Sequence, residues 1–207
     1  MEQSCRKSFL LGVIVNVTIT HRKDPDLKNP ESDEMIRKAV EEDLDAVENI
    51  YDEIHDSEEC GEISIGWIRG IYPTRKTAED SIKRGDLFVL EDGSVFGAGI
   101  INQIQVDSYE KGAWEYEAKD NEVCALHTLV ISPKAGGKGY GKQFVEFYED
   151  YAGKLGCHEL RLDTNEKNKR AREMYRKLGY KEVGIVPTVF NGIPDVNLVL
   201  LEKRIGL

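Results

Sequence analysis

The segment Leu129-Val130-Ile131-Ser132-Pro133-Lys134-Ala135-Gly136-Gly137-Lys138-Gly139-Tyr140-Gly141-Lys142-Gln143 decides how this chain is interpreted. An apolar run predicted as a strand ends, four glycines follow within six residues, and a helical pattern begins at Tyr140. Glycine lets a ligand approach the backbone without a clash against Cβ, and a helix N-terminus leaves backbone N–H groups free. Lys134, Lys138 and Lys142 add positive charge, with no acidic residue in the segment. The segment therefore predicts an anion site, best matched by a di- or triphosphate.

Two common phosphate-binding loops fit the segment poorly. Residues 136–142 match G-x-x-x-x-G-K, but Gln143 stands where a P-loop carries the hydroxyl that holds Mg²⁺. Gly137, Gly139 and Gly141 give G-x-G-x-G rather than the G-x-G-x-x-G of dinucleotide-binding folds. The order of predicted elements is also wrong for a parallel nucleotide-binding sheet. Both interpretations are therefore disfavoured.

The same segment resembles the acyl-CoA loop of the GNAT N-acetyltransferase superfamily, which reads Q/R-x-x-G-x-G/A after a strand ending in V-x-P. Ile131-Ser132-Pro133 matches the strand end, and Gly139 and Gly141 match the two glycines. The Q/R position falls on Gly136, which departs from the family pattern. The resemblance then implies weaker or rearranged pyrophosphate contacts, with Lys138 or Lys142 compensating.

A second motif lies downstream at the spacing typical of that family. Residues 168–180, from Asn168 through Ala171 and Tyr175 to Gly179-Tyr180, resemble N-x-x-A-x-x-x-Y-x-x-x-G-F/Y. The resemblance covers roughly residues 35–204, whereas residues 1–34 read as an extension or linker. We therefore expect an N-acetyltransferase domain at 35–207 preceded by an N-terminal extension at 1–34 that is not part of its core.

The spacing of apolar residues predicts a series of short helices and strands in this domain. Glycine, proline, asparagine and aspartate mark the turns between them. We expect an α/β (α+β) fold with a GNAT-like, mixed and mostly antiparallel central sheet flanked by helices. The predicted strands are 35–40, 87–90, 95–106, 123–131, 159–163, 180–190 and 196–202. The predicted helices are 42–59, 74–84, 140–155 and 168–178, and residues 107–121 are predicted as a polar loop.

Composition narrows the classes of partner. The 207 residues include 28 Lys and Arg against 38 Asp and Glu, a net charge of −10 that argues against nucleic acid or an anionic membrane surface. The four cysteines, Cys5, Cys60, Cys124 and Cys157, form no C-x-x-C pair and have no histidine at metal-ligand spacing. We expect no bound metal, a cytoplasmic location and no membrane span. Whether the protein forms a homodimer stays open.

The resemblance also implies which residues hold acetyl-CoA as co-substrate. The pantetheine arm would pair with the backbone of Leu129, Val130 and Ile131, and the pyrophosphate would lie on backbone amides of the glycine loop. The second motif would contribute Asn168, Ala171 and Tyr175. The implied loop residues are Gly136, Gly137, Lys138, Gly139, Tyr140, Gly141 and Lys142.

Acetyl transfer to an amine requires an acid and a base. Tyr175 lies where the family often carries a tyrosine aimed at the CoA sulfur, so it is the predicted acid, with simple packing as the alternative. The base is less clear, because Ala125 occupies the position of the carboxylate that many members use. His127 on the same strand face and Glu122 at the strand start are candidates, against ordinary roles as a strand-face histidine and a solvated carboxylate.

The acceptor is predicted only as a class. Residues 41–62 hold 11 acidic residues and no Lys or Arg, a charge that would attract a cationic amine. The alternative, for which there is a strong case, is the ordinary polar face of an amphipathic helix. Trp67, Trp114 and Tyr116 are candidates for contact with the acceptor or for plain packing. The predicted function is transfer of an acetyl group from acetyl-CoA to a primary amine of a small molecule or peptide, directly in a ternary complex. The alternative is a non-catalytic acyl-CoA- or CoA-binding module.

Overall fold

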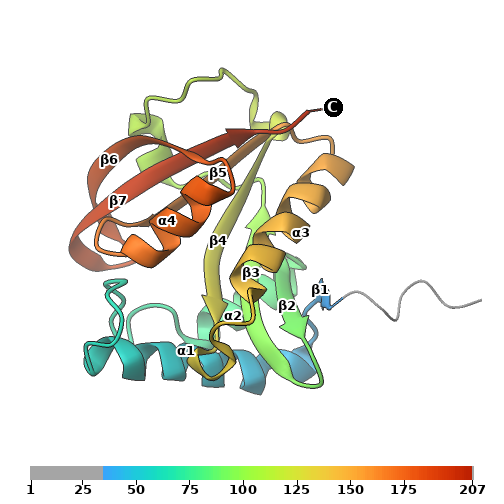
Figure 1. Ribbon diagram of the computed structural model, residues 1–207, viewed down its shortest axis with the longest axis vertical. Coiled ribbons are helices and arrows are strands. Elements are labelled where there is room, and N and C mark those ends of the chain that lie inside the picture. Colours follow the sequence, from blue (N-terminus) through green and yellow to red (C-terminus); the bar gives the residue numbers. More distant parts are fainter. Residues whose placement is uncertain (1–34, 207) are drawn as a thin grey trace, which may run out of the picture. The chain divides into compact units, whose positions relative to one another are not determined.

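The structure is a computed structural model that describes residues 35–206, and these residues form one mixed sheet with helices on both faces (Figure 1). The strand order is β1-β2-β3-β4-β5-β7-β6. All neighbouring strands are antiparallel except β4 and β5, which are parallel. The predicted fold class is confirmed. The strands are β1 (Ile36–Lys38), β2 (Leu87–Glu91), β3 (Val95–Asn102), β4 (Val123–Ile131), β5 (Glu159–Asn165), β6 (Lys181–Phe190) and β7 (Ile193–Arg204).

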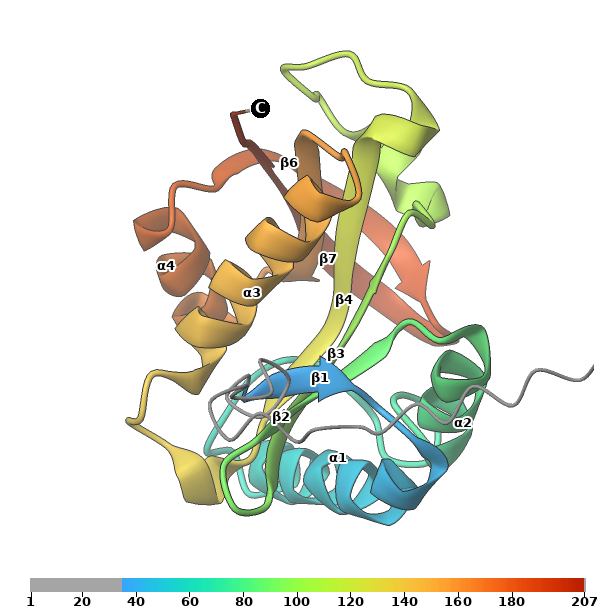
Figure 2. The ribbon, with the colours of Figure 1, turned by 90° about the vertical axis from the view of Figure 1, so that its right-hand side faces the viewer.

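Four α-helices cover the two faces of this sheet (Figure 2). α1 (Leu44–Glu59) and α2 (Arg75–Arg84) pack on one face of the N-terminal strands. α3 (Tyr140–Lys154) and α4 (Lys169–Lys177) pack on the other face. Burial of these apolar helix stripes against the sheet supplies most of the stability of a domain of this size.

The helix ends follow local chemistry that the sequence displays. α2 begins after Thr74, which has extended backbone angles, and ends at Gly85 with φ of 74°. α1 begins after a short 3₁₀ turn in which the Asp43 carboxylate accepts a hydrogen bond from Val40 N at 2.8 Å and pairs with Arg37 at 2.7 Å. These contacts hold β1 against the start of α1.

The sheet divides between its two parallel strands. β4 and β5 pair from Val123 with Glu159 to Leu126 with Leu162 and no further. Beyond that point β4 continues against β3, and β5 continues against β7. The β3–β4 register shifts by one residue where Thr128 adopts a φ of 51°, which is a β-bulge. The bulge turns the second half of β4 away from β5 and opens a gap between the two strands.

Some element boundaries differ from the sequence-based expectation. β3 ends at Asn102 rather than Val106, because the Asn102 side chain accepts a hydrogen bond from Ile104 N at 2.9 Å and turns the chain. Residues 107–122, predicted mainly as loop, contain two 3₁₀ helices, η2 (Asp107–Lys111) and η3 (Asp120–Glu122). β7 is longer at both ends than predicted. Its N-terminal end pairs with β6 from Ile193, and its C-terminal end pairs with the start of β5 as far as Arg204.

Two observations of the described residues bear on membranes and metals. Between residues 35 and 206 no helix has the length and apolar character needed to cross a bilayer. The same residues contain no group of three or more histidine, cysteine or carboxylate side chains arranged to hold a metal ion. The predicted extension at 1–34 lies outside the described residues, so the domain boundary stays a prediction.

Candidate active site

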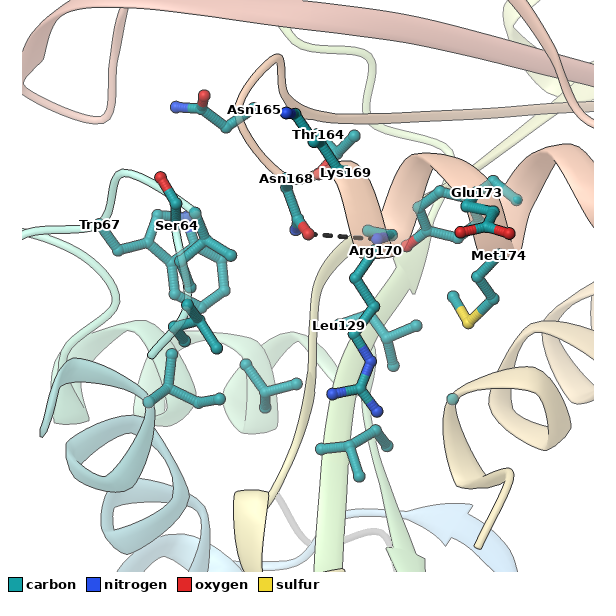
Figure 3. A pocket seen from close by; sticks show the side chains of 18 of the residues that line it. Ser64, Trp67, Leu129, Thr164, Asn165, Asn168, Lys169, Arg170, Glu173 and Met174 are labelled. Atoms are coloured by element: carbon teal, nitrogen blue, oxygen red, sulfur yellow. Dashed lines mark hydrogen bonds between the residues drawn. The ribbon is translucent and has the colours of Figure 1, made fainter. Parts of the chain in front are cut away.

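The gap between β4 and β5 is the mouth of a cavity of about 1130 Å³. Its walls come from the second half of β4, the end of β5, the glycine loop, α4, and the segment between α1 and α2. Figure 3 shows Ser64 and Trp67 on one side of this cavity, with Thr164, Asn165 and Asn168 facing them across it. One continuous space therefore connects the two sequence motifs with the segment that follows α1.

The glycine loop forms one end of the cavity with its backbone. Gly137 and Gly139 have φ of 84° and 79°, in the left-handed region that favours glycine. Gly139 is the N-cap of α3 and provides no side-chain cap. In the described part of the chain, no backbone N–H between Gly137 and Lys142 has a hydrogen-bond partner. These N–H groups at a helix N-terminus are the donors that an anion requires.

The loop lysines contact neighbouring side chains. Lys134 Nζ lies 2.6 Å from the Glu53 carboxylate, and Lys142 Nζ lies 3.1 Å from Glu146. Lys138 Nζ lies 5.2 Å from the centre of the Phe96 ring and is absent from the cavity wall. The other implied CoA-binding residues all line the cavity: Leu129, Val130, Ile131, Gly136, Gly137, Gly139, Tyr140, Gly141, Lys142, Asn168, Ala171 and Tyr175.

The start of α4 forms the opposite wall. Asn168 is the N-cap of this helix, and its side-chain oxygen accepts a hydrogen bond from Ala171 N at 3.1 Å. The Arg170 side chain extends from α4 into the cavity beside Leu129 (Figure 3). Neither a hydrogen bond nor a salt bridge joins Arg170 to another residue between 35 and 206. Arg170 is therefore an exposed cation on the cavity wall that forms no ion pair within the described chain.

Tyr175 lies on the cavity side of α4. Its side chain is 6% exposed, and burial raises the pKa of its phenol well above the usual value of 10. The ring packs edge-on against Tyr180 with centroids 5.8 Å apart. The hydroxyl therefore stays protonated over the whole working range of pH, as a proton donor requires.

The segment between α1 and α2 forms the side of the cavity opposite α4. The Glu58 carboxylate accepts hydrogen bonds from Ile65 N at 2.7 Å and Gly66 N at 2.9 Å, which fixes this segment to α1. A Cβ at Gly66 would collide with the Asn165 side chain at the end of β5. Trp67 follows and lines the cavity. The backbone of this segment therefore lies directly against the end of β5, at a distance that only glycine permits.

An aromatic group continues this wall toward β6. Trp67 and Tyr72 meet edge-on with ring centroids 5.8 Å apart, and Tyr72 meets Phe190 in the same way at 5.3 Å. The Tyr72 hydroxyl hydrogen-bonds to Thr128 at the bulge of β4. Trp114 and Tyr116 do not line the cavity, and the Trp114 indole instead donates to Tyr109 O at 2.7 Å. Of the aromatic acceptor candidates, the structure brings Trp67 to the site.

Two residues at the site, Asp163 and Tyr109, were not predicted from the sequence. Asp163 lies on β5 just beyond the last residue that pairs with β4, and it lines the cavity. The Tyr109 hydroxyl, from η2, donates to Asp163 Oδ2 at 3.0 Å. The available signal was the change from the apolar alternation of β5 to Asp163-Thr164-Asn165 at its carboxyl end, where parallel strands present ligand-binding side chains.

The two predicted bases lie outside the cavity wall. His127 Nε2 is 3.0 Å from Ile104 O, and its ring stacks on Tyr109 with centroids 6.4 Å apart. Glu122 lies at the start of β4, where its carboxylate accepts a hydrogen bond from Lys119 N at 3.0 Å. Cys124 is buried beneath α3, and burial raises its pKa to about 12. No cysteine in the described part of the chain lines the cavity.

Comparison with known proteins agrees with this geometry. The model of the acetyltransferase (GNAT) family matches residues 44–180, so the chain belongs to that family. The chain is thus an acyltransferase. It is 28% identical over 168 residues to a streptothricin acetyltransferase from Escherichia coli, an alignment that covers 79% of this chain and 88% of that protein. Matches to two uncharacterized N-acetyltransferases cover 38% and 32% of those proteins.

Solved structures share the fold. A GNAT-family acetyltransferase from Streptococcus agalactiae 2603 superposes with a TM-score of 0.70 and 24% identity, covering 83% of this chain and 95% of that one. The YncA protein from Salmonella typhimurium, determined with its cofactor acetyl-CoA, superposes with a TM-score of 0.60 and 16% identity, covering 83% and 94%. Identities at this level establish the common architecture.

Proposed function

We propose that this protein transfers the acetyl group of acetyl-CoA directly to a primary amine of a small cationic molecule, with both substrates bound together. The observation that carries this proposal is the single cavity that joins the glycine loop to the aromatic wall through the gap between β4 and β5. An elongated donor and a separate acceptor can meet in such a space without leaving the protein.

The cavity fits the chemistry of acetyl-CoA at three places. Free N–H groups at the start of α3 suit the pyrophosphate, and the unpaired edge of β4 at Leu129 to Ile131 suits the amides of a pantetheine chain. The Arg170 side chain, which lies beside Leu129, supplies a positive charge that forms no salt bridge in the described chain. A Cβ at Gly141 would lie 3.2 Å from Met174 Sδ, so the loop and α4 already approach as closely as side chains permit.

The chain supplies a proton donor for the leaving group. Acetyl-CoA brings the activated acetyl thioester, and the protein must hold it and donate a proton as negative charge develops on sulfur. Tyr175 lines the cavity and keeps its proton. No cysteine among the described residues lines the cavity, which favours transfer without a covalent acetyl-enzyme.

The acceptor side supports a cationic small molecule. Glu62 and Asp163 line the cavity and can attract a cation. The acidic side chains of α1 do not line it and are engaged elsewhere, by Arg69, Arg75 and Lys134 and by backbone N–H groups. One relative is named for acetylating streptothricin, which makes that compound a suitable first test acceptor. A panel should include streptothricin, spermidine and a lysine-containing peptide, with thiol release from acetyl-CoA as the readout.

Thiol release that depends on an amine separates the enzyme from the alternative of a non-catalytic CoA-binding module. Binding should first be measured by calorimetry with acetyl-CoA and, in parallel, Mg-ATP. We expect micromolar acetyl-CoA binding and no ATP binding. Acetyl-CoA binding without thiol release for any amine would favour the binding module, and no acetyl-CoA binding would overturn the proposal.

The Tyr175→Phe variant tests the proton donor. We expect kcat to fall by about 100-fold, a typical contribution of a positioned acid, while the Kd for acetyl-CoA changes by less than about 2-fold. The ring, and with it the packing against Tyr180, stays in place. An unchanged kcat would remove Tyr175 from the chemistry and leave it a packing role.

A further inference from the structure

We propose that Asp163 is the binding site for the acceptor's ammonium group and the base that takes its proton. This assignment rests on the proposed acetyl transfer and names the residue that receives the amine. It also defines the acceptor class as a primary ammonium carried on an apolar stem.

The position of Asp163 carries the first part of the argument. It is the first residue of β5 after the parallel pairing with β4 ends at Leu126 and Leu162. Its backbone is held on the other side by pairing with Leu200 of β7. The side chain therefore lies in the gap itself, on a rigid strand, and lines the same cavity as Tyr175 and Leu129.

The charge of Asp163 has no counterion in the described part of the chain. No salt bridge joins it to any lysine, arginine or histidine between residues 35 and 206, and its hydrogen bond there is the one from the Tyr109 hydroxyl at 3.0 Å. A desolvated carboxylate without a cation is unfavourable unless a cation arrives or a proton binds. A substrate ammonium provides first the cation and then the proton.

The titratable groups that face Asp163 form no salt bridge with it, so its carboxylate is available to bind an ammonium group. They are Tyr72 before α2, Tyr109 of η2, His127 of β4 and Tyr175 of α4. Burial raises the pKa of Asp163 above its usual 3.8, while His127 and the Tyr109 hydroxyl act in the opposite direction. Three of the four neighbours are phenols that stay protonated and carry no positive charge. The fourth, His127, acts on Asp163 without forming a salt bridge to it.

The wall next to Asp163 defines the stem of the acceptor. Trp67, Phe190, Val196 and Leu198 line the cavity on the side away from the glycine loop. Tyr72 joins Trp67 to Phe190 and reaches the bulge of β4. A ligand along this wall contacts apolar and aromatic surface and, in the gap between β4 and β5, the carboxylate of Asp163. An alkyl or aryl chain that ends in a primary ammonium fits that order of chemistry.

The proton and bond changes balance without another reactant. Asp163 takes one proton from the ammonium, and the freed nitrogen lone pair forms the C–N bond to the acetyl carbon. The C–S bond breaks, its electron pair stays on sulfur, and the Tyr175 hydroxyl protonates that sulfur. The second proton of the nitrogen restores Tyr175, and Asp163 releases its proton to solvent. The sum is one ammonium and one thioester giving one amide, one thiol and one proton.

The Asp163→Asn variant tests the base. We expect kcat/KM for the best amine of the panel to fall by about 100-fold and its decline toward low pH to disappear, with acetyl-CoA affinity unchanged. The exposed Asp150→Asn on α3 makes the same change of charge outside the cavity and should retain wild-type kinetics. Wild-type kcat/KM and an unchanged pH profile in Asp163→Asn would overturn the assignment.

The Tyr109→Phe variant distinguishes a titrating carboxylate from a structural one. Without the phenol donor the Asp163 carboxylate is less stabilised, so its pKa rises and the acidic limb of the kcat/KM profile moves to higher pH. A purely structural role would lower activity equally at every pH. An acidic limb that stays in place in this variant would argue against Asp163 as the titrating group.

A binding experiment is independent of turnover. n-Hexylamine and 1-hexanol are titrated into the CoA-bound enzyme at pH 8, where the amine is charged. We expect the amine to bind at least about tenfold more tightly than the alcohol, and Asp163→Asn to abolish this preference. Equal preference in both proteins would overturn the ammonium site. If the wild type binds hexylamine in this way but acetylates no amine, the proposed function fails and the ammonium site stands.

Discussion

Single glycines of the loop shape the backbone that, in the proposed function, receives the pyrophosphate. Gly139 has a φ of 79° and no atom within 4 Å of an added Cβ, so a side chain there meets backbone strain and no collision. Gly156, just after α3, has nearly the same geometry, with φ of 78° and open space. The two positions therefore separate backbone strain from ligand binding.

We expect Gly139→Ala and Gly156→Ala each to lower the free energy of unfolding by about 1 kcal/mol, measured by urea denaturation, because both force alanine into the left-handed region. Gly139→Ala alone should also weaken acetyl-CoA binding, by about tenfold, because the N–H groups around it are then misdirected. Equal acetyl-CoA affinity in the two variants would show that this turn does not form the phosphate site.

At the scale of elements, the positive charge that reaches the cavity comes from α4. The lysines of the glycine loop are instead used in contacts with neighbouring side chains. Lys134 and Lys142 are paired with glutamates, whereas Arg170 extends into the cavity. Gly136 occupies the position where the family pattern has glutamine or arginine. Arg170 is thus placed to replace the missing polar group from the other wall.

We expect Arg170→Ala to raise the Kd for acetyl-CoA by about tenfold, the loss of one charge-assisted contact. Arg176→Ala removes the same charge from an exposed position of α4 that does not line the cavity, and should change the Kd by less than about 2-fold. The measurement is calorimetry at fixed ionic strength. A similar loss in both variants would indicate a general electrostatic effect of the helix.

The ends of helices and strands were predictable where glycine or a capping residue marks them in the adjacent sequence. The site was predictable where its residues belong to a short sequence motif. α3 begins at Tyr140 as predicted because glycines stop the preceding turn, and α4 begins after its Asn168 cap. Asp163 and Tyr109 were missed because their hydrogen bond joins residues 54 positions apart. Nothing near either residue in sequence shows that η2 folds back over β5, so this part of the site required the structure.

At the scale of the whole molecule, Asp163 connects function to stability. Its pKa is raised in the folded state, so the folded protein binds this proton more tightly than the unfolded chain. The resulting stabilisation is fully present below the usual pKa of 3.8 and is lost as pH rises through the raised value. Above that raised pKa, the folded protein holds a charge on Asp163 that no salt bridge in the described chain compensates.

We therefore expect Asp163→Asn to raise the Tm at pH 7 while it lowers activity, a common trade at functional sites. The difference in Tm between the variant and the wild type should shrink as pH falls toward 4. Thermal scans from pH 4 to 8 measure this directly. A variant that is less stable than the wild type at neutral pH would show that the carboxylate is well compensated.

Because β4 and β5 pair over only part of their length, the stability of the sheet also depends on the ligand in the gap between them. The strands β1–β4 and the strands β5–β7 pair only between residues 123–126 and 159–162, and His158 N donates to Glu122 O just before this stretch. A donor molecule bound along the open edges, as proposed, would bridge the two halves and join them into one cooperative unit. Resistance to unfolding then increases with the logarithm of its concentration, so the protein's lifetime would follow the acetyl-CoA supply.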